Sequence, residues 1–124
     1  MSRYSILIVD DEANQRLMLE QALRALAADW SISTAASGQE ALAVMEQQVP
    51  DLIITDYHMP AMNGLELIAR VRSHDLRSRI ILITAYSSPE LNAAVQRLGV
   101  DHYLTKPVPL AELRSLATAA LESS

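Results

Sequence analysis

Cysteine is absent from this chain of 124 residues, which excludes disulfide bridges and thiolate metal sites. Long apolar runs are absent too, since none approaches the roughly 20 residues that a membrane-spanning helix needs. No signal peptide precedes the first apolar run. We therefore expect a soluble protein of the cytoplasm with no membrane partner.

Basic charge and glycine are scarce as well. Ten lysines and arginines against 15 aspartates and glutamates give a net charge of −5, which argues against direct binding to nucleic acid or to an anionic membrane. The three glycines form no loop that could cradle a nucleotide phosphate. Lysine occurs once, at Lys106, and the other nine basic residues are arginines. A genomic preference for arginine explains this most simply, but it makes the position of the one lysine notable.

The apolar residues that are present form short runs rich in isoleucine and valine, which predict strands buried on both faces of a sheet. Segments with helical periodicity separate these runs, and the strict alternation is typical of βαβ units. The expected strands cover residues 5–9, 30–36, 51–55, 79–84 and 101–105, and the helices cover 12–28, a segment from 38, 63–72, 88–99 and a segment from 109. We therefore expect one domain over residues 1–124, with an α/β fold built on a doubly wound, five-stranded parallel sheet and five helices. The flavodoxin-like strand order 2-1-3-4-5 is the commonest such arrangement.

Polar caps and inward-facing apolar stripes support the expected helices. The residues placed to cap helices are Ser37 with Glu40, Asn63 with Glu66, and Ser88 before Pro89, while Gly99 suits the end of the fourth helix. The residues expected to face the core are Leu19, Ala22, Leu23, Leu26, Ala41, Val44, Met45, Leu91, Ala94, Val95, Leu98, Leu110, Leu113, Ala117 and Leu121.

Four of the expected strands end in reactive side chains. The carboxyl ends of parallel strands lie along one edge of the sheet, where ligands of open α/β sheets bind. Asp10 and Asp11 follow the first strand, Asp56 the third, Thr84 ends the fourth and Lys106 follows the fifth. We therefore expect three carboxylates, a hydroxyl and an ammonium within reach of one phosphoryl group.

The three carboxylates would repel one another if they converge. Two like charges about 4 Å apart repel by about 4 kcal/mol at an effective dielectric constant near 20, so three contacts cost on the order of 10 kcal/mol. This is comparable to the ~5–15 kcal/mol that stabilises a whole domain, so the cluster requires a cation. Oxygen ligands without histidine or cysteine favour Mg²⁺. With this ion and Lys106 beside it, Asp56 on its central strand is the natural phosphoryl acceptor, and Thr84 can donate to a phosphoryl oxygen.

Each of these residues also has a purely structural interpretation. An aspartate after a strand is most often a helix cap or a turn former, which suits Asp10 and Asp11 taken alone. Thr84 alone is an ordinary β-branched strand residue, and Tyr103 is a half-buried core aromatic. Their occurrence together with Asp56 and Lys106 favours the functional interpretation.

The chain resembles the receiver domain of two-component response regulators over essentially its whole length, and it is close to the chemotaxis regulator in size. The resemblance lies in the acidic pair Asp10-Asp11, in Asp-x-x-Met-Pro-x-x-Asn-Gly from Asp56 to Gly64, in Thr84-Ala85, and in Tyr103-x-x-Lys106-Pro107. Each motif is weak alone, but all of them in this order and at these spacings are highly specific. The resemblance implies a signalling phosphoacceptor rather than an enzyme that acts on a separate substrate.

The resemblance also implies a role for each residue of the acidic cluster. Asp56 would be phosphorylated by a sensor histidine kinase or a phosphotransfer protein. Asp11 and Asp56 would bind Mg²⁺ directly, Asp10 would bind it through water, and the main-chain carbonyl of His58 would complete the protein's share of the ligands.

A switch is implied in the same way. Lys106 would hold the acceptor carboxylate and the phosphoryl group, Thr84 would move towards that group, and Tyr103 would swing inward to fill the space that Thr84 leaves. The Lys106-Pro107 peptide bond would be cis. A C-terminal output domain and a phosphorylation-dependent homodimer are further partners that the family allows. His102 stands where many DNA-binding members carry an acidic residue, which argues against their common symmetric dimer.

Two residues near the expected site depart from the usual pattern. His58 and Tyr86 occupy places that, in this family, flank the incoming water and tune loss of the phosphoryl group. Their bulk would shield the acyl phosphate, so we predict slow self-dephosphorylation. His58 is better suited to covering the site than to binding metal, because no second histidine or cysteine supports it.

Functions of other classes fit less well. A phosphatase of the haloacid-dehalogenase type needs a second acid two residues after the nucleophile, and His58 occupies that place. An interaction module that works without phosphorylation would not need the acceptor, the acidic pair, the hydroxyl and the lysine together. A flavin or nucleotide carrier lacks its glycine-rich loop. The sole tryptophan, Trp30, is expected opposite the reactive edge, so its fluorescence should report Mg²⁺ binding poorly.

Overall fold

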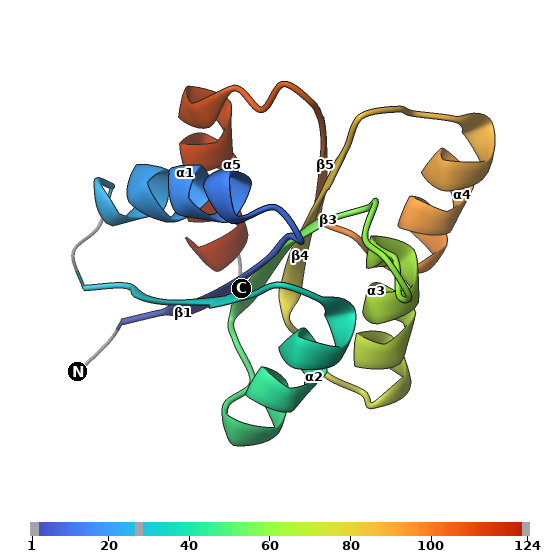
Figure 1. Ribbon diagram of the computed structural model, residues 1–124, viewed down its shortest axis with the longest axis horizontal. Coiled ribbons are helices and arrows are strands. Elements are labelled where there is room, and N and C mark those ends of the chain that lie inside the picture. The colour runs from blue at the N-terminus through green and yellow to red at the C-terminus, as the bar shows by residue number, and fades with distance from the viewer. Residues whose placement is uncertain (1–2, 27–28, 123–124) are drawn as a thin grey trace.

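The computed structural model describes residues 3–26 and 29–122, in which strands and helices alternate (Figure 1). The strands are β1 (Ser5–Val9), β2 (Ser31–Ala35), β3 (Leu52–Asp56), β4 (Arg79–Thr84) and β5 (His102–Thr105). The helices are α1 (Ala13–Arg24), α2 (Gly38–Gln47), α3 (Gly64–Ser73), α4 (Pro89–Arg97) and α5 (Leu110–Glu122). The predicted alternation of five strands and five helices is confirmed.

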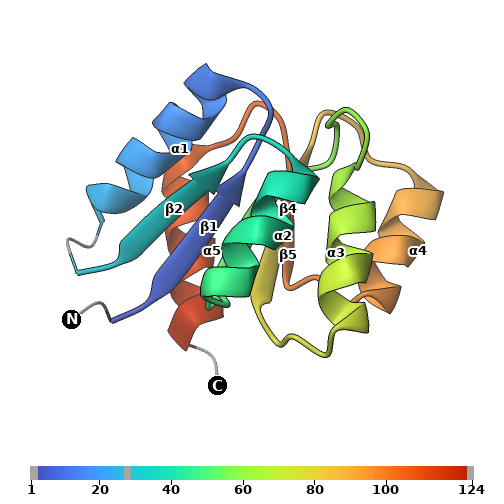
Figure 2. The same cartoon turned by 60° about the horizontal axis from the view of Figure 1, so that its bottom comes forward.

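The five strands form one parallel sheet in the order β2-β1-β3-β4-β5. This is the predicted flavodoxin-like order, and it places β3 between β1 and β4. Figure 2 shows α1 and α5 behind the sheet, with α2, α3 and α4 in front of it. Because all strands run the same way, the loops that follow them leave the sheet along a single edge.

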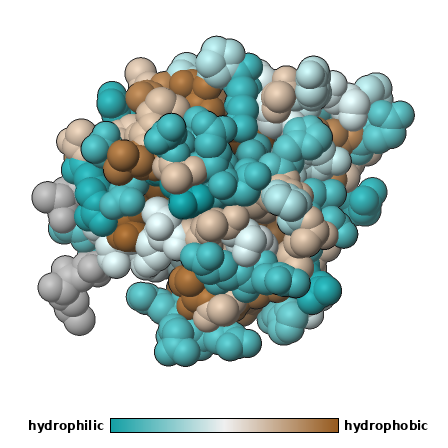
Figure 3. All heavy atoms as spheres, viewed as in Figure 1, coloured by the Kyte–Doolittle hydropathy of each residue, from teal (hydrophilic) through white to brown (hydrophobic). Residues whose placement is uncertain are grey.

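Each face of the sheet carries its own apolar core. Ile8 and Ile54 face the core under α1 and α5, whereas Leu7 and Ile53 face the core under α2, α3 and α4. All four are at most 1% exposed, so the strands are buried on both faces, as their continuous apolar character predicts. The outer surface seen in Figure 3 is mainly hydrophilic, with apolar side chains scattered over it. Among the described residues, no helix has the length and apolar character that a membrane span needs.

The predicted caps form as hydrogen bonds in the structure. The side chains of Ser37, Asn63 and Ser88 each accept from the main-chain N–H three residues further on. Within the described ranges a full capping box, with the return bond from Glu66, forms only at Asn63. Gly99 follows α4 with a φ of +68°, a conformation that glycine adopts without strain. The side chains thus satisfy main-chain groups that the helix ends leave free.

Several predicted boundaries differ from the observed ones by one or two residues. β2 begins at Ser31 rather than residue 30 and ends at Ala35, β5 begins at His102, and β3 extends to Asp56. α1 ends at Arg24, whereas its predicted end near Ala28 lies outside the described residues. The expected inward position of Leu26 is wrong, because the helix ends before this residue and Leu26 is 40% exposed. The other residues predicted to face the core are buried or partly buried.

Candidate functional site

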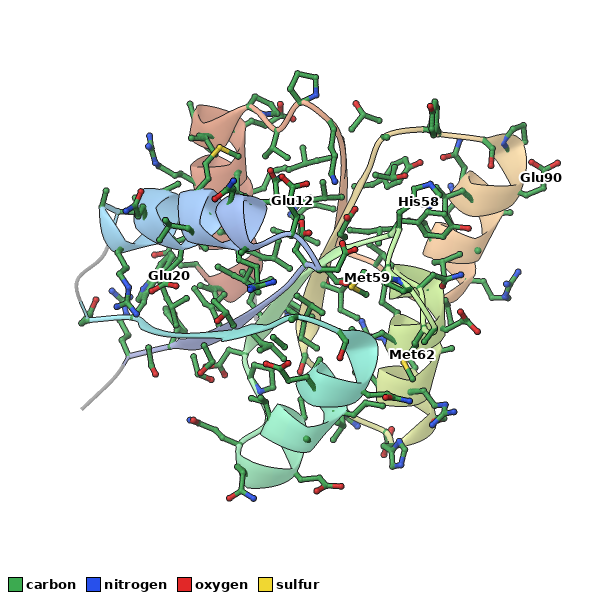
Figure 4. All side chains as sticks on the ribbon, viewed as in Figure 1. Glu12, Glu20, His58, Met59, Met62 and Glu90 are labelled. Atoms are coloured by element: carbon green, nitrogen blue, oxygen red, sulfur yellow. The ribbon has the colours of Figure 1, made fainter. Side chains whose placement is uncertain are left out.

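The loops after β1, β3, β4 and β5 bring the predicted site residues to one edge of the sheet. Asp10, Asp11 and Asp56 each offer a carboxylate oxygen, and these oxygens all lie within 4.8 Å of one another. Asp10 and Asp56 are buried, whereas Asp11 is exposed. Figure 4 shows Glu12 and His58 on the loops that follow β1 and β3. The predicted meeting of the acidic pair with the end of the central strand is therefore confirmed.

Asp10 is held at three of its polar groups. Its N–H donates to the carbonyl of Ala35 over 3.1 Å, and its carboxylate accepts from the N–H of Glu12 over 2.9 Å. Its own carbonyl accepts a 2.7 Å hydrogen bond from the guanidinium of Arg16. The side chain is therefore oriented before any ligand arrives.

Burial raises the pKa of Asp10 from its ordinary value of 3.8 to about 6. The hydrogen bond from the Glu12 N–H opposes this shift, the charge of Asp56 adds to it, the ammonium of Lys106 opposes it and the charge of Asp11 adds to it. Desolvation is the largest cause, because only 2% of this residue is exposed. A positive charge placed among the three carboxylates would favour the ionised form of Asp10.

Asp56 has one paired and one unpaired carboxylate oxygen. Its Oδ2 forms an ion pair with the Nζ of Lys106 over 3.1 Å. Its Oδ1 is buried and accepts no hydrogen bond from any described residue. A buried, unpartnered carboxylate oxygen is costly unless a ligand completes its contacts. The hard oxygen donors around it fit Mg²⁺, which binds through one or two carboxylates and keeps positions for water and phosphate oxygens.

Thr84 contacts the loop after β4. Its side chain is fully buried, and its hydroxyl donates to the carbonyl of Tyr86 over 3.0 Å and accepts from the N–H of Tyr86 over 3.3 Å. The hydroxyl of Tyr103 donates to the same carbonyl over 3.5 Å. Partial burial raises the pKa of Tyr103 above 10.0, so this hydroxyl keeps its proton and remains a donor at neutral pH. Thr84 and Tyr103 are therefore linked through one carbonyl group.

His58 and Tyr86 lie beside each other at the surface. Their rings meet edge to face with centroids 6.5 Å apart, and the His58 ring also meets Tyr57 edge to face at 4.8 Å. His58 is exposed, and Tyr86 is 74% exposed. The aromatic group therefore lies on the loops that follow two neighbouring strands, β3 and β4.

Two features near Asp56 complete the local structure. The Lys106-Pro107 bond is cis, as the resemblance implies. A Cβ at Gly64 would collide with the main-chain oxygen of Asp56 and would lie 3.0 Å from Leu82 Cδ1, so only glycine lets the first turn of α3 approach this strand. The N–H of Gly64 also donates to the carbonyl of Tyr57 over 2.8 Å.

The sequence pattern identified the acidic cluster, Thr84, Lys106 and Tyr103, but it gave no role to Arg16 or Gly64. Gly64 lies within the motif that starts at Asp56, and a glycine at a helix start after a strand is a signal for close packing. Arg16 gave no such signal, because an arginine in the first turns of an exposed helix is usually solvated.

The family described as the response regulator receiver domain matches residues 6–118 of this chain. Among curated proteins, the regulatory protein AtoC of Escherichia coli is 38% identical over 117 residues, which is 94% of this chain and 25% of that protein. The transcriptional regulatory protein PrrA of Mycobacterium tuberculosis is 34% identical, over 94% of this chain and 49% of that protein. An uncharacterized 14.6 kDa protein of Leptolyngbya boryana is 37% identical, over 91% of this chain and 86% of that protein. The chain thus spans a quarter to a half of AtoC and PrrA.

Solved structures give the same result. The receiver domain of the response regulator NarL from Mycobacterium tuberculosis superposes with a TM-score of 0.88 at 26% identity, over 100% of both chains. The chemotaxis protein CheY4 from Vibrio cholerae has a TM-score of 0.86 at 32% identity, over 95% of this chain and 98% of that one. Both likenesses extend over essentially the whole fold described above.

Proposed function

Because the chain belongs to the receiver-domain family of two-component response regulators, we propose that Asp56 is the aspartate that becomes phosphorylated. Receiver domains are signalling proteins that partner with histidine kinases, and their phosphorylation on aspartate depends on Mg²⁺. The observation that carries the assignment is the state of the Asp56 carboxylate. One oxygen pairs with Lys106, and the other is buried without a partner beside two further carboxylates.

The proposed reaction is a phosphoryl transfer from a phosphohistidine of the kinase or of a phosphotransfer protein. A carboxylate oxygen of Asp56 forms a bond to phosphorus while the P–N bond breaks, and the imidazole nitrogen leaves with the electron pair. The carboxylate is presented by a central strand whose backbone is fixed on both sides, and Lys106 lies where charge builds up on the phosphoryl oxygens. The protein therefore contributes mainly position and charge.

Mg²⁺ is part of the proposal. Asp11 and Asp56 would bind the ion directly, Asp10 through water, and the main-chain carbonyl of His58 would supply a further oxygen. The close approach of the three carboxylates and the unpartnered Oδ1 support this donor set. When bound, the ion would neutralise the carboxylates and polarise the phosphoryl oxygens.

The proposed switch uses the loop after β4. A phosphoryl group on Asp56 offers the Thr84 hydroxyl a charged acceptor in place of the Tyr86 carbonyl, and a hydrogen bond to a charged group is the stronger of the two. Once Thr84 releases that carbonyl, Thr84 no longer holds the loop that carries Tyr86, and Tyr103, which donates to the same carbonyl, can move inward with the change in the loop. Phosphorylation would thus shift the population of two arrangements of β5 and the loop after β4.

The wider role is proposed on the same basis. We infer that residues 1–124 act as a single receiver domain in the cytoplasm, that self-dephosphorylation is slow, and that the switch acts on a partner, on a C-terminal output domain or on a phosphorylation-dependent homodimer. The net charge of −5 supports a domain that does not itself bind nucleic acid.

The assignment can be tested by intact mass spectrometry after incubation with acetyl phosphate, with and without Mg²⁺. The unsubstituted protein should gain one phosphoryl group only with Mg²⁺, and hydroxylamine should remove it. Asp56→Asn should gain none, because the amide oxygen is a much weaker nucleophile of nearly the same shape. Asp75→Asn is a matched control, since Asp75 is exposed and has a φ of +57°, which asparagine tolerates. An adduct that persists in Asp56→Asn would overturn the assignment.

A further inference from the structure

We propose that Arg16 is a positioning residue for the Mg²⁺ site, because its guanidinium holds the main-chain carbonyl of Asp10 and so fixes the acidic pair after β1. The inference rests on the proposed function and adds a residue that the sequence pattern did not indicate. It concerns how the ligands are held in place, since Arg16 is not itself a ligand.

The contact is short and charge-assisted. Arg16 lies in the first turn of α1, and its own N–H donates to the carbonyl of Glu12 over 3.1 Å. From there its side chain reaches back, and Nη1 donates to the carbonyl oxygen of Asp10 over 2.7 Å. Hydrogen bonds from a charged donor are roughly twice as strong as neutral ones. The start of α1 is thereby tied to the end of β1 across the turn that carries Asp11.

The carbonyl of Asp10 depends on this bond. Asp10 is only 2% exposed, so solvent has little access to its main-chain oxygen. The N–H of Asp10 donates to Ala35, and its carboxylate accepts from the Glu12 N–H. Among the residues that the structure describes, Arg16 is the donor to the carbonyl of Asp10. A buried acceptor that loses its donor costs about 1–3 kcal/mol, and the turn would rotate to regain a partner. Such a rotation would move the carboxylates of both Asp10 and Asp11.

Other arginines that contact α1 lie away from the acidic cluster. Arg24 forms an ion pair with Glu20 one turn away on the same helix, over 2.9 Å. Arg114 of α5 donates to the carbonyl of Ala22 over 3.2 Å. The contact made by Arg114 is of the same kind as that made by Arg16, a guanidinium bound to a main-chain carbonyl. It therefore provides a control that separates a general loss of stability from an effect on the metal ligands.

The test compares Mg²⁺ affinity and phosphorylation in three variants of residues 1–124. Arg16→Met removes the donor and keeps much of the side-chain length, Arg16→Lys restores a charged donor, and Arg114→Met is the control. Mg²⁺ affinity is measured by titration calorimetry on the unphosphorylated protein, and the rate of phosphorylation by acetyl phosphate is measured at saturating Mg²⁺. Loss of a residue that orients a metal ligand typically weakens binding about 10–100-fold. We expect Arg16→Met to weaken Mg²⁺ binding about tenfold, at the lower end of that range.

The results for these variants together distinguish an effect of Arg16 on the position of the metal ligands from a general loss of protein stability. Arg16→Lys should recover part of the lost affinity, and Arg114→Met should bind Mg²⁺ as the unsubstituted protein does. The phosphorylation rate of Arg16→Met should return close to normal once Mg²⁺ is saturating, because the ion then restores the geometry of the pair. In the metal-free protein, amide hydrogen exchange at Asp11 and Glu12 should be faster in Arg16→Met than in Arg114→Met.

Two results would overturn the inference. One is an unchanged Mg²⁺ affinity in Arg16→Met, and the other is an equal loss in Arg114→Met. If Arg16→Met does not fold, Arg16→Gln is measured in its place. Its neutral donor is weaker than the guanidinium and should lower the Mg²⁺ affinity, and an unchanged affinity would overturn the inference. Failure of the proposed function is distinguishable, since it would appear as absent phosphorylation of Asp56 in the unsubstituted protein, whatever the Mg²⁺ affinities.

Discussion

Asp10 is a residue whose ionisation the fold alters strongly. Its pKa rises from 3.8 to about 6 on folding, chiefly because the carboxyl is buried. Between these two values the folded protein binds a proton that the unfolded chain has released, so the free energy of unfolding falls as pH rises through this window. At about 1.4 kcal/mol per pKa unit, the loss from this one group is about 3 kcal/mol, and it is nearly complete about one pH unit above the folded pKa of about 6.

We therefore predict that the metal-free protein is less stable at pH 7.5 than at pH 4.5 by an amount that Asp10→Asn largely abolishes. Urea unfolding in the presence of a chelator would measure it. Mg²⁺ should raise the free energy of unfolding strongly at pH 7.5 and little at pH 4.5, because it binds the ionised cluster of the folded state. Equal pH dependence in Asp10→Asn and the unsubstituted protein would assign the effect to other groups.

The single residues His58 and Tyr86 give a second prediction. Their rings meet edge to face at the surface, where each would restrict the approach of water to a phosphorylated Asp56. We expect Tyr86→Ala and His58→Asn to speed the loss of the phosphoryl group about three- to tenfold each, equivalent to roughly 0.7–1.4 kcal/mol in the barrier. Decay of the mass adduct after removal of acetyl phosphate measures this rate. If both variants decay at the normal rate, the two rings have no part in phosphoryl lifetime.

The sequence predicted the chemical groups of the site better than their contacts. Asp56 and Lys106 follow strands whose apolar character is unambiguous, so their meeting was determined by the sheet alone. The bonds of Thr84 could not be predicted, because its hydroxyl contacts whichever group the loop after β4 presents. The bond from Arg16 to the Asp10 carbonyl was unpredictable for the same reason, since it depends on a side-chain rotamer and on a turn.

At the scale of elements, α3 begins unusually close to β3. Gly64 opens the helix directly against the main-chain oxygen of Asp56, and its N–H binds the carbonyl of Tyr57. We predict that Gly64→Ala lowers the free energy of unfolding by about 1–3 kcal/mol, the usual cost of overpacking, and also slows phosphorylation because the acceptor strand must shift.

Gly38→Ala is a matched control for this prediction. Gly38 also begins a helix, and a Cβ there would meet the side chain of Met62, which is flexible and can move. We expect Gly38→Ala to leave phosphorylation unchanged. Chemical unfolding and the rate of adduct formation would be measured on both variants. A normal rate in Gly64→Ala would show that the acceptor tolerates a displacement of α3.

The ends of helices could be predicted from the sequence where contacts between neighbouring residues determine them. Asn63 and Ser88 capped their helices as predicted, because a side-chain cap is a contact between residues only three apart. The end of α1 was predicted too late, since apolar periodicity continues to Leu26 although the helix ends at Arg24. Arg72, by contrast, donates to the carbonyls of Leu76, Ser78, Leu98 and Gly99, and ties the ends of α3 and α4 together. No local pattern indicates a contact of this kind.

At the scale of the whole molecule, the parallel sheet separates its two edges. Trp30 precedes β2, is 7% exposed and meets Tyr4 edge to face with centroids 6.2 Å apart. It therefore lies at the edge opposite Asp10 and Asp56, roughly 15 Å away along strands that rise about 3.3 Å per residue. The order of the strands followed from alternation and handedness, which is why this placement could be predicted from sequence.

We predict that Mg²⁺ leaves the emission of Trp30 essentially unchanged. A reporter placed beside the site, as in Tyr57→Trp, should respond to the same titration, because Tyr57 follows Asp56 directly. The emission of the two proteins would be compared during titration with Mg²⁺. Urea unfolding is the positive control, since it shows that the emission of Trp30 can change. Strong quenching of Trp30 by Mg²⁺ would mean that the two edges of the sheet communicate.

The ion pair between Lys106 and Asp56 gives the molecule a single chemical handle. Lys106 is the only lysine of the chain, and its Nζ lies 3.1 Å from the carboxylate of Asp56. Isotope-labelled lysine would therefore place one labelled ammonium in the whole protein, at the site, and its one resonance would follow each change of charge on Asp56. The same scarcity is a vulnerability. Acylation of this one side-chain amine would remove the cation paired with Asp56. In a lysine-rich protein, most of the acylated lysines would lie away from such a site.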